Sequence, residues 1–159
     1  MDRYLVLPFW LSGQHLAVAL DQVVRVLPAL RSTPLPGAPE SICGLANVRG
    51  RLLPVVDLAR RFGWPAPALT LWQPFIWLTS SKRELLLPVE QVEAVSACAA
   101  ADFTPAPDPR VPSSLLRGVL RSAEGLLLIQ DVEQLLSDTD EARLVELLTL
   151  REESIDVAR

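Results

Sequence analysis

The sequence contains very few of the residues that carry enzyme and metal chemistry. His15 is the only histidine, and Cys43 and Cys98 are the only cysteines. One histidine and two distant cysteines match no zinc or iron spacing, and nothing in the sequence supplies the nucleophile and orienting acid that a catalytic histidine needs. We therefore expect no catalytic residue, metal or cofactor, an exposed His15 in a hairpin turn, and two reduced, separately buried thiols.

Glycine, net positive charge and long apolar runs are also scarce. The seven glycines form neither a G-x-G-x-x-G nor a G-x-x-x-x-G-K-[ST] loop, which excludes the usual phosphate-binding motifs. Fifteen basic against nineteen acidic residues give a formal charge of −4, which disfavours nucleic acid as a partner. No apolar run approaches the roughly 20 residues of a membrane span, and residues 5–11 are too short for a signal peptide. These absences predict a soluble, cytoplasmic binding module.

Proline, in contrast, is abundant, with 14 residues in a chain of 159. Proline removes a backbone donor and ends regular structure, so we expect many short elements. Short apolar runs bounded by Gly, Pro, Ser and Asp are typical of strands, and their recurrence predicts an all-β fold. These runs are 5–9, 16–20, 23–27, 45–48, 52–56, 75–78, 85–89, 92–95, 119–120 and 126–129.

The sequence also repeats itself weakly. Residues 16–23 align with residues 85–92, and residues 44–58 align with residues 118–132 in the same order and at a similar offset. Two copies of one short-stranded unit predict two similar β-barrels packed together, because closing a sheet removes its exposed edges. Proline-rich stretches at 62–67 and 104–109 end the first unit and interrupt the second.

Helical signals are confined to three places. Asp57 and Asp131 each precede a short amphipathic stretch, 58–62 and 132–136, and are expected to cap it. After Asp138 the apolar period changes to that of a helix, with Leu144, Leu147 and Leu148 on one face. Asp138 with Glu141 resembles an N-terminal capping box, which predicts a C-terminal helix over about residues 139–152.

One segment resembles the signature of the CheW-like family. Residues 44–58 read G-L-A-N-V-R-G-R-L-L-P-V-V-D-L, and their core N-x-R-G-x-x-x-P-x-x-D-L is specific to that family. Weaker similarities flank it in the expected order, at residues 33–39, 87–92, 104–107 and 128–136. The resemblance therefore covers nearly the whole chain.

The resemblance implies a fold that agrees with the repeat. The chain would form a single CheW-like domain, residues 1–159, of two pseudo-symmetric five-stranded SH3-like β-barrels packed together with a C-terminal α-helix. The first barrel would span mainly about residues 16–70. The second would span mainly about residues 75–136, with the N-terminal strand contributing.

The resemblance also implies a function. CheW-like proteins are non-enzymatic adaptors that bind the cytoplasmic tip of a chemoreceptor and the regulatory domain of a CheA-type histidine kinase. The protein would then be cytoplasmic, would be recruited to membrane-associated receptor arrays, and would bind no nucleic acid and insert into no membrane. Such signalling contacts are usually small, and arrays compensate by multivalency.

Residues at the receptor-binding surface follow from the same resemblance. In the family, the arginine of the N-x-R-G turn shapes this surface. An arginine suits an interface because its planar fork can grip a carboxylate or carbonyl groups. Where the family often has an acid, this sequence has Arg25, which argues against a charge pair with Arg49 and favours a specialised chemosensory array. The expected receptor-binding residues are Arg49, Asn47, Gly50, Arg25, Val23 and Val18.

Other interpretations remain open. The chain could be a barrel domain of a larger signalling protein, although it begins and ends close to the expected limits of the domain. It could serve a non-chemotaxis pathway such as motility or surface sensing. An unrelated SH3-like binder of peptides or oligonucleotides is disfavoured by the charge of −4, and a hydrolase is disfavoured by the single histidine.

Overall fold

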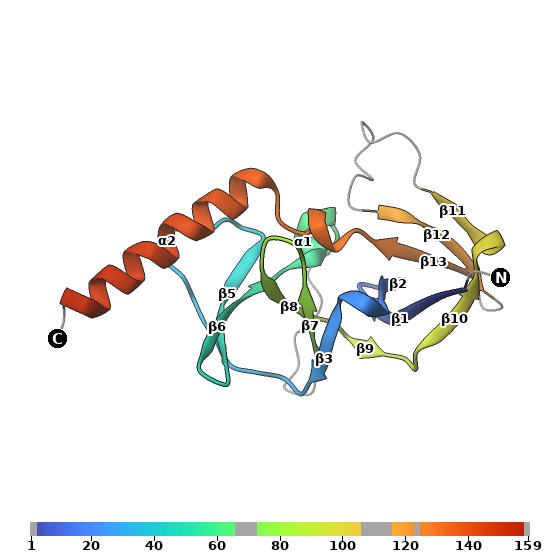
Figure 1. Cartoon of the computed structure of the whole chain (residues 1–159), viewed down its shortest axis with the longest axis horizontal. Helices are drawn as coiled ribbons and strands as arrows, with labels where there is room; N and C mark the ends of the chain where they lie inside the picture. The colour runs from blue at the N-terminus through green and yellow to red at the C-terminus, as the bar shows by residue number, and fades with distance from the viewer. Residues whose placement is uncertain (1–2, 66–72, 106–115, 123–124, 158–159) are drawn as a thin grey trace.

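The computed structural model describes residues 3–65, 73–105, 116–122 and 125–157, the last six by their backbone alone. Most of these residues lie in short strands, which confirms the predicted all-β class (Figure 1). The strands are β1 (Arg3–Leu11), β2 (Gln14–Ala19), β3 (Val23–Leu27), β4 (Ser32–Thr33), β5 (Ile42–Val48), β6 (Arg51–Val56), β7 (Phe75–Thr79), β8 (Glu84–Pro88), β9 (Gln91–Val92), β10 (Ser96–Ala99), β11 (Phe103–Pro105), β12 (Leu116–Ser122) and β13 (Gly125–Gln130).

Helical elements are few. The described residues form α1 (Leu58–Phe62), α2 (Asp138–Val157) and the short 3-10 helices η1 (Leu20–Gln22), η2 (Ala100–Asp102) and η3 (Val132–Gln134). The predicted caps are present, since the Asp57 carboxylate accepts the amide of Arg60 and the Asp131 carboxylate accepts the amide of Glu133, each at 3.1 Å. Both caps start a helical turn directly after equivalent strands of the two sheets, β6 and β13.

The strands form two sheets that have the same layout. The six-stranded sheet has the order β3-β7-β8-β6-β5-β4, and the path through the seven-stranded sheet has the order β10-β1-β2-β13-β12-β11, with β9 pairing to β1. In each sheet the only parallel contact among the described strands is at the centre, β6 with β8 and β13 with β2. The two layouts can be superimposed strand for strand, as the sequence repeat predicts.

The sheets differ from the expected barrels in size and in membership. They contain six and seven strands instead of five, and the hydrogen bonds among described residues do not close either sheet into a ring. The strands β7 and β8, expected in the second unit, pair with β3 and β6 in the first sheet, while β2 pairs with β1 and β13 in the second. The N-terminal hairpin therefore completes the C-terminal unit. Residues 66–70 and 106–109 of the expected boundaries lie outside the described residues.

Gly44 and Gly118 occupy equivalent places in the repeat, and both positions require glycine because a neighbouring strand approaches the backbone closely. A Cβ atom on Gly44 would lie 2.5 Å from the carbonyl oxygen of Thr33, and one on Gly118 would lie 2.6 Å from the carbonyl oxygen of Thr104. In both sheets the register shifts just before the glycine, as in a β-bulge. The glycine thus lets an edge strand cross close to the bulged strand.

The two sheets share one main core. Strand β1 contributes Phe9, strand β2 contributes Leu16, and both side chains are fully buried. They pack in one cluster with side chains of the other sheet, including Val56, Ile76 and Leu78. A smaller apolar cluster lies within each sheet. Most of the buried apolar residues that the structure describes belong to this shared cluster, so we expect the two repeats to fold as one unit.

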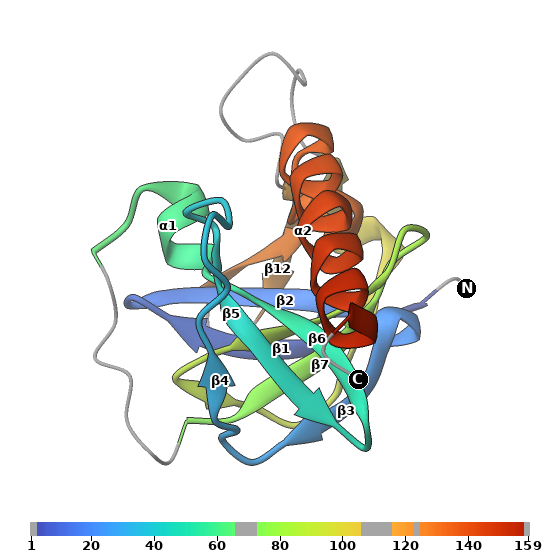
Figure 2. The same ribbon diagram turned by 90° about the vertical axis from the view of Figure 1, so that its left-hand side faces the viewer.

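Helix α2 begins one residue earlier than expected and has a different cap. The Ser137 hydroxyl accepts the amide of Asp140 at 3.1 Å, so Ser137 is the capping residue. Glu141, predicted to close a capping box with Asp138, instead forms an ion pair with Arg83, with Nε 2.8 Å from both carboxylate oxygens. Leu144 is buried in the shared core, and beyond Leu148 the helix runs away from the sheets (Figures 1 and 2).

Candidate binding surface

The turn between β5 and β6 carries three of the predicted binding residues. Arg49 has φ 54° and Gly50 has φ 85°, so both central residues of the turn are left-handed. This pair is the signature of a two-residue hairpin that follows the twist of its strands. The Asn47 side-chain oxygen accepts the amide of Gly50 at 2.8 Å, so Asn47 and Gly50 shape the turn. All three residues are exposed.

The residues that follow the turn anchor it to the sheet. Arg51 forms an ion pair with Glu84 of β8, the strand beyond β6. On the other side of the turn, Val48 is buried in the cluster that holds Trp77. The turn is thus held by an ion pair and by apolar packing, while Arg49 between them has its side chain in solvent.

Strand β3 carries a second exposed patch. Val24, Arg25 and Val26 are all exposed, with Val24 and Val26 exposed by 44% and 40%. Leu27 packs against the same cluster as Val48, which brings β3 toward the β5–β6 hairpin although several strands separate them in the sheet order. Both views place β3 and this turn at the lower end of the molecule (Figures 1 and 2). The two elements frame one end of the six-stranded sheet.

The six predicted residues therefore do not form one surface. Asn47, Arg49 and Gly50 form the turn, and Arg25 with half-buried Val23 lies on β3. Val18 is fully buried in the core and offers no contact area to a partner. Sequence analysis placed Val24, Val26 and Leu52 in apolar strand runs and did not single them out as exposed. For Val24 and Val26 the reason is that β3 is an edge strand. An edge strand exposes both of its faces more than a central strand does, and an apolar run does not reveal which strand will be an edge.

His15 is not the exposed turn residue that the sequence suggested. It lies in β2 opposite Trp10, and the two rings stack with centroids 4.2 Å apart and an interplanar angle of 3°. Its Nε2 atom pairs with the carboxylate of Glu93. The turn itself is formed by Ser12 and Gly13, one position earlier than expected. His15 thus links the N-terminal hairpin to the segment after β9.

The remaining chemistry-bearing groups are dispersed. Cys98 is buried as expected, but Cys43 is exposed on β5. Within the described part of the chain, no group of three or more His, Cys, Asp or Glu residues could hold a metal ion. No helix in that part is both long enough and apolar enough to cross a membrane. The exposed end of the six-stranded sheet, with Arg49 and the exposed residues of β3, is the candidate binding surface.

Comparison with known proteins agrees with the sequence resemblance. The family model described as CheW-like domain matches residues 5–140. The Chemotaxis protein CheW of Rhizobium meliloti (strain 1021) is 30% identical over 125 residues, which cover 77% of this chain and 80% of the relative. The Chemotaxis protein CheW of Klebsiella aerogenes is 27% identical over 136 residues, covering 84% of this chain and 82% of the relative.

A solved structure supports the fold. The scaffolding protein TtCheW from Thermoanaerobacter tengcongensis superimposes with a TM-score of 0.79 at 21% identity, covering 87% of this chain and 96% of that one. This likeness confirms the architecture independently of the motif at residues 44–58. With the family match extending over most of its residues, the chain belongs to the CheW-like family.

Proposed function

We propose that this chain, a scaffold of the CheW-like family, couples the cytoplasmic tips of chemoreceptors to the regulatory domain of a CheA-type histidine kinase. It catalyses no reaction and acts in the cytoplasm, at membrane-associated receptor arrays. The family match over residues 5–140 and relatives named chemotaxis proteins support this role. The dispersed placement of His15 and the two cysteines is in keeping with a binding protein.

The observation that carries the proposal is the geometry of the Arg49 turn. A left-handed conformation costs a non-glycine residue roughly 1–2 kcal/mol, and such strain tends to be kept at binding sites. Arg49 is held there at φ 54° between Asn47 and Gly50, with its side chain exposed. A rigid turn presents the guanidinium at little further cost in entropy. We infer that Arg49 binds a carboxylate or backbone carbonyls of the receptor tip.

Exposed apolar residues beside the turn fit the same role. Leu52 follows Arg51 on β6, and Val24 and Val26 lie on β3 at the same end of the sheet. Apolar side chains around an arginine anchor exclude water from a contact and strengthen it. We expect these three residues to surround Arg49 in the receptor complex.

Charge reversal at Arg49 tests the proposal. We expect Arg49→Glu to weaken receptor binding by about 2–5 kcal/mol while leaving kinase binding and the circular dichroism spectrum nearly unchanged. The matched control is Arg121→Glu, because Arg121 is an exposed arginine in the equivalent hairpin of the other sheet. Each variant is titrated separately against a receptor tip and against the kinase regulatory domain. Loss of kinase binding with intact receptor binding would place Arg49 in the wrong interface, and unchanged binding to both would contradict the proposal.

A further inference from the structure

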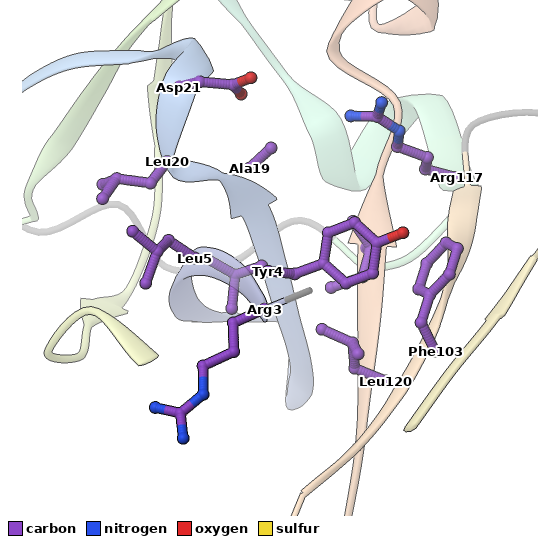
Figure 3. A pocket seen from close by; sticks show the side chains of 11 residues that line it. Arg3, Tyr4, Leu5, Ala19, Leu20, Asp21, Phe103, Arg117 and Leu120 are labelled. Atoms are coloured by element: carbon purple, nitrogen blue, oxygen red, sulfur yellow. The ribbon is translucent and has the colours of Figure 1, made fainter. Parts of the chain in front are cut away.

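The seven-stranded sheet contains a pocket of about 660 Å³ that the proposed function does not use. The lining residues that are buried, and that we call its floor, are Val6, Leu120 and Ile129. Figure 3 labels Leu120 among them. The pocket lies near the N-terminal end of β1, at the opposite end of the molecule from the Arg49 turn (Figure 1). Pockets of roughly 300–1,000 Å³ with mostly apolar linings are typical of sites for small ligands.

The repeat explains why the pocket is open. Val6 lies opposite Ala19 in the seven-stranded sheet, and Phe75 lies opposite Pro88 at the equivalent place in the six-stranded sheet. Phe75 is buried in the apolar cluster of its own sheet, whereas Val6 occupies the corresponding cluster and also lines the pocket. A valine is much smaller than a phenylalanine, so space that is filled in one repeat is empty in the other.

A second pair of positions differs in the same direction. Ala17 of β2 aligns with Leu86 of β8, and both are fully buried in the clusters of their sheets. Ala17 belongs to the same cluster as Val6 but does not line the pocket, so Val6 is the difference that bears on it directly. Interiors are normally filled to crystal-like density, so the space beside Val6 is available to a ligand.

The rim of the pocket is aromatic. The rings of Tyr4 and Phe103 lie with centroids 5.2 Å apart and an interplanar angle of 51°. They stand side by side in Figure 3 and form one wall, while the Leu5 side chain extends from β1 in the opposite direction, toward Leu20. Tyr4 is 45% exposed, so apolar atoms of this wall meet solvent. A third ring placed against Tyr4 and Phe103 would bury that surface and meet aromatic neighbours at a favourable tilt.

Three charged side chains surround the apolar part of the pocket. Arg3 and Arg117 lie on different sides of it, and Asp21 stands at the edge near Leu20 (Figure 3). Two positive charges and one negative charge leave one net positive charge, which favours a ligand with a single negative charge. A carboxylate matches the fork of an arginine better than a spherical anion does.

We propose that this pocket binds a small aryl-alkyl carboxylate, with the aromatic ring between the Tyr4–Phe103 wall and the Val6 floor and the carboxylate at Arg117. The apolar floor and the aromatic rim match the ring and the alkyl chain of that ligand, and the single net positive charge matches its carboxylate. The protein is then a scaffold with an accessory site for an amphiphilic acid, remote from the Arg49 turn.

Titration of the isolated protein with 4-phenylbutyrate tests the site without any receptor or kinase, so the outcome is independent of the proposed coupling function. We expect saturable binding at or below about 1 mM by calorimetry, and chemical-shift changes in the amides of β1 and β12. The uncharged 4-phenylbutan-1-ol should bind about tenfold more weakly, and the amine 4-phenylbutylamine more weakly still. Absence of binding up to about 10 mM, or equal affinity for the acid and the alcohol, would overturn the proposal.

Variants of the residues that line the pocket test whether the ligand binds there. Val6→Phe fills the pocket as Phe75 fills the other repeat, and should abolish binding of both acid and alcohol. If that variant does not fold, Ala19→Leu serves the same purpose. Arg117→Gln should reduce affinity for the acid about tenfold and leave the alcohol unaffected, whereas Arg121→Gln on the same strand should change neither. A folded, filled variant that still binds 4-phenylbutyrate would show that the ligand lies elsewhere.

Discussion

At the scale of single residues, a position can require glycine for either of two reasons, a close approach of neighbouring backbone or a left-handed backbone conformation. Gly44 has an ordinary backbone but no space, because its Cβ would lie 2.5 Å from a carbonyl oxygen of the neighbouring strand. Gly50 has ample space but a φ of 85°, which a side chain rarely adopts. We expect Gly50→Ala to cost about 1 kcal/mol and Gly44→Ala to cost about 3 kcal/mol or more, because β4 must move. Urea unfolding of both variants gives the comparison, and equal losses would contradict the close approach.

Arg25 stands where the family resemblance led us to expect an acid, and its exposed position on β3 makes a role in specificity testable. Exposed like charges repel weakly, by about 1 kcal/mol or less, so Arg25 and Arg49 at one end of the sheet are compatible with the fold. We propose that they select a receptor tip rich in carboxylates. Arg25→Glu should hardly change the melting temperature, should weaken binding to the cognate receptor, and should improve binding to receptors of commoner CheW systems.

Varying the ionic strength distinguishes an electrostatic effect of Arg25→Glu on receptor affinity from an effect of a change in structure. Added salt screens exposed charges, so the affinity difference between wild type and Arg25→Glu should shrink between low and high salt. Equal affinities of the two proteins for both receptors at low salt would mean that Arg25 is only solvated and carries no specificity.

At the scale of elements, helix α2 packs Leu144 into the shared core and is also held by polar contacts at its first turn. Arg83 and Glu141 form a largely buried bidentate pair, and Ser41 donates to the Asp140 carboxylate at 2.8 Å. Lys82 and Asp138 form an exposed pair with Nζ 2.6 Å from Oδ1. The hydrogen bond between them raises the pKa of Lys82 and lowers the pKa of Asp138. Both shifts mean that the pair stabilises the folded state while both groups are charged.

The pH dependence of this pair follows from the directions of the shifts. The stabilisation is present above the ordinary aspartate pKa of 3.8 and below the ordinary lysine pKa of 10.5. It is lost as the pH falls through the lowered pKa of Asp138 or rises through the raised pKa of Lys82. Lys82→Met should therefore lower the melting temperature slightly at neutral pH and low salt, and this difference should vanish in acid. A difference that stays constant with pH would indicate packing of the side chain instead.

A variant of the more buried Arg83–Glu141 pair gives a loss of stability with which the effect of Lys82→Met can be compared. Glu141→Gln breaks the pair with Arg83, whose side chain is only 18% exposed, and hydrogen bonds between charged and partly buried groups are worth about 1.5–3 kcal/mol. We expect its melting temperature to fall clearly more than that of Lys82→Met. The reverse order would mean that the exposed pair holds the helix.

At the scale of the whole molecule, the exchange of the N-terminal hairpin makes the two repeats interdependent. Phe9 of β1 is fully buried in the core that both sheets share. Truncation of a buried phenylalanine costs about 3–5 kcal/mol, and here the loss should affect both sheets. We expect Phe9→Ala to lower the hydrogen-exchange protection of β5–β6 and of β12–β13 by the same free energy. Loss of protection confined to the seven-stranded sheet would mean that the repeats unfold separately.

Local sequence determined the elements whose cause is local. The caps at Asp57 and Asp131, the left-handed turn at Gly50 and the strand positions of nine of the ten apolar runs follow from nearest neighbours. The run at residues 92–95 is the exception, because only Val92 lies in a strand. The strands β4, β10 and β11 were missed because they are two to four residues long and hold few large apolar side chains. These short strands form because a neighbouring strand offers hydrogen-bond partners, so their own residues show no strand pattern.

Tertiary structure decided which sheet each strand joined, which strands became edges and what the polar side chains met. His15 does not lie in the predicted turn, because the register of β1 and β2 places it opposite Trp10, where its Nε2 atom also pairs with Glu93. Glu141 does not close the predicted capping box because its carboxylate pairs with Arg83, which lies far away in sequence. The sequence alone determined the repeat, the all-β class and the family motif, because these depend on spacing along the chain. The exchange of hairpins, the exposed edge at β3 and the pocket beside Val6 depend on contacts between residues far apart in sequence, and only the folded chain brings those residues together.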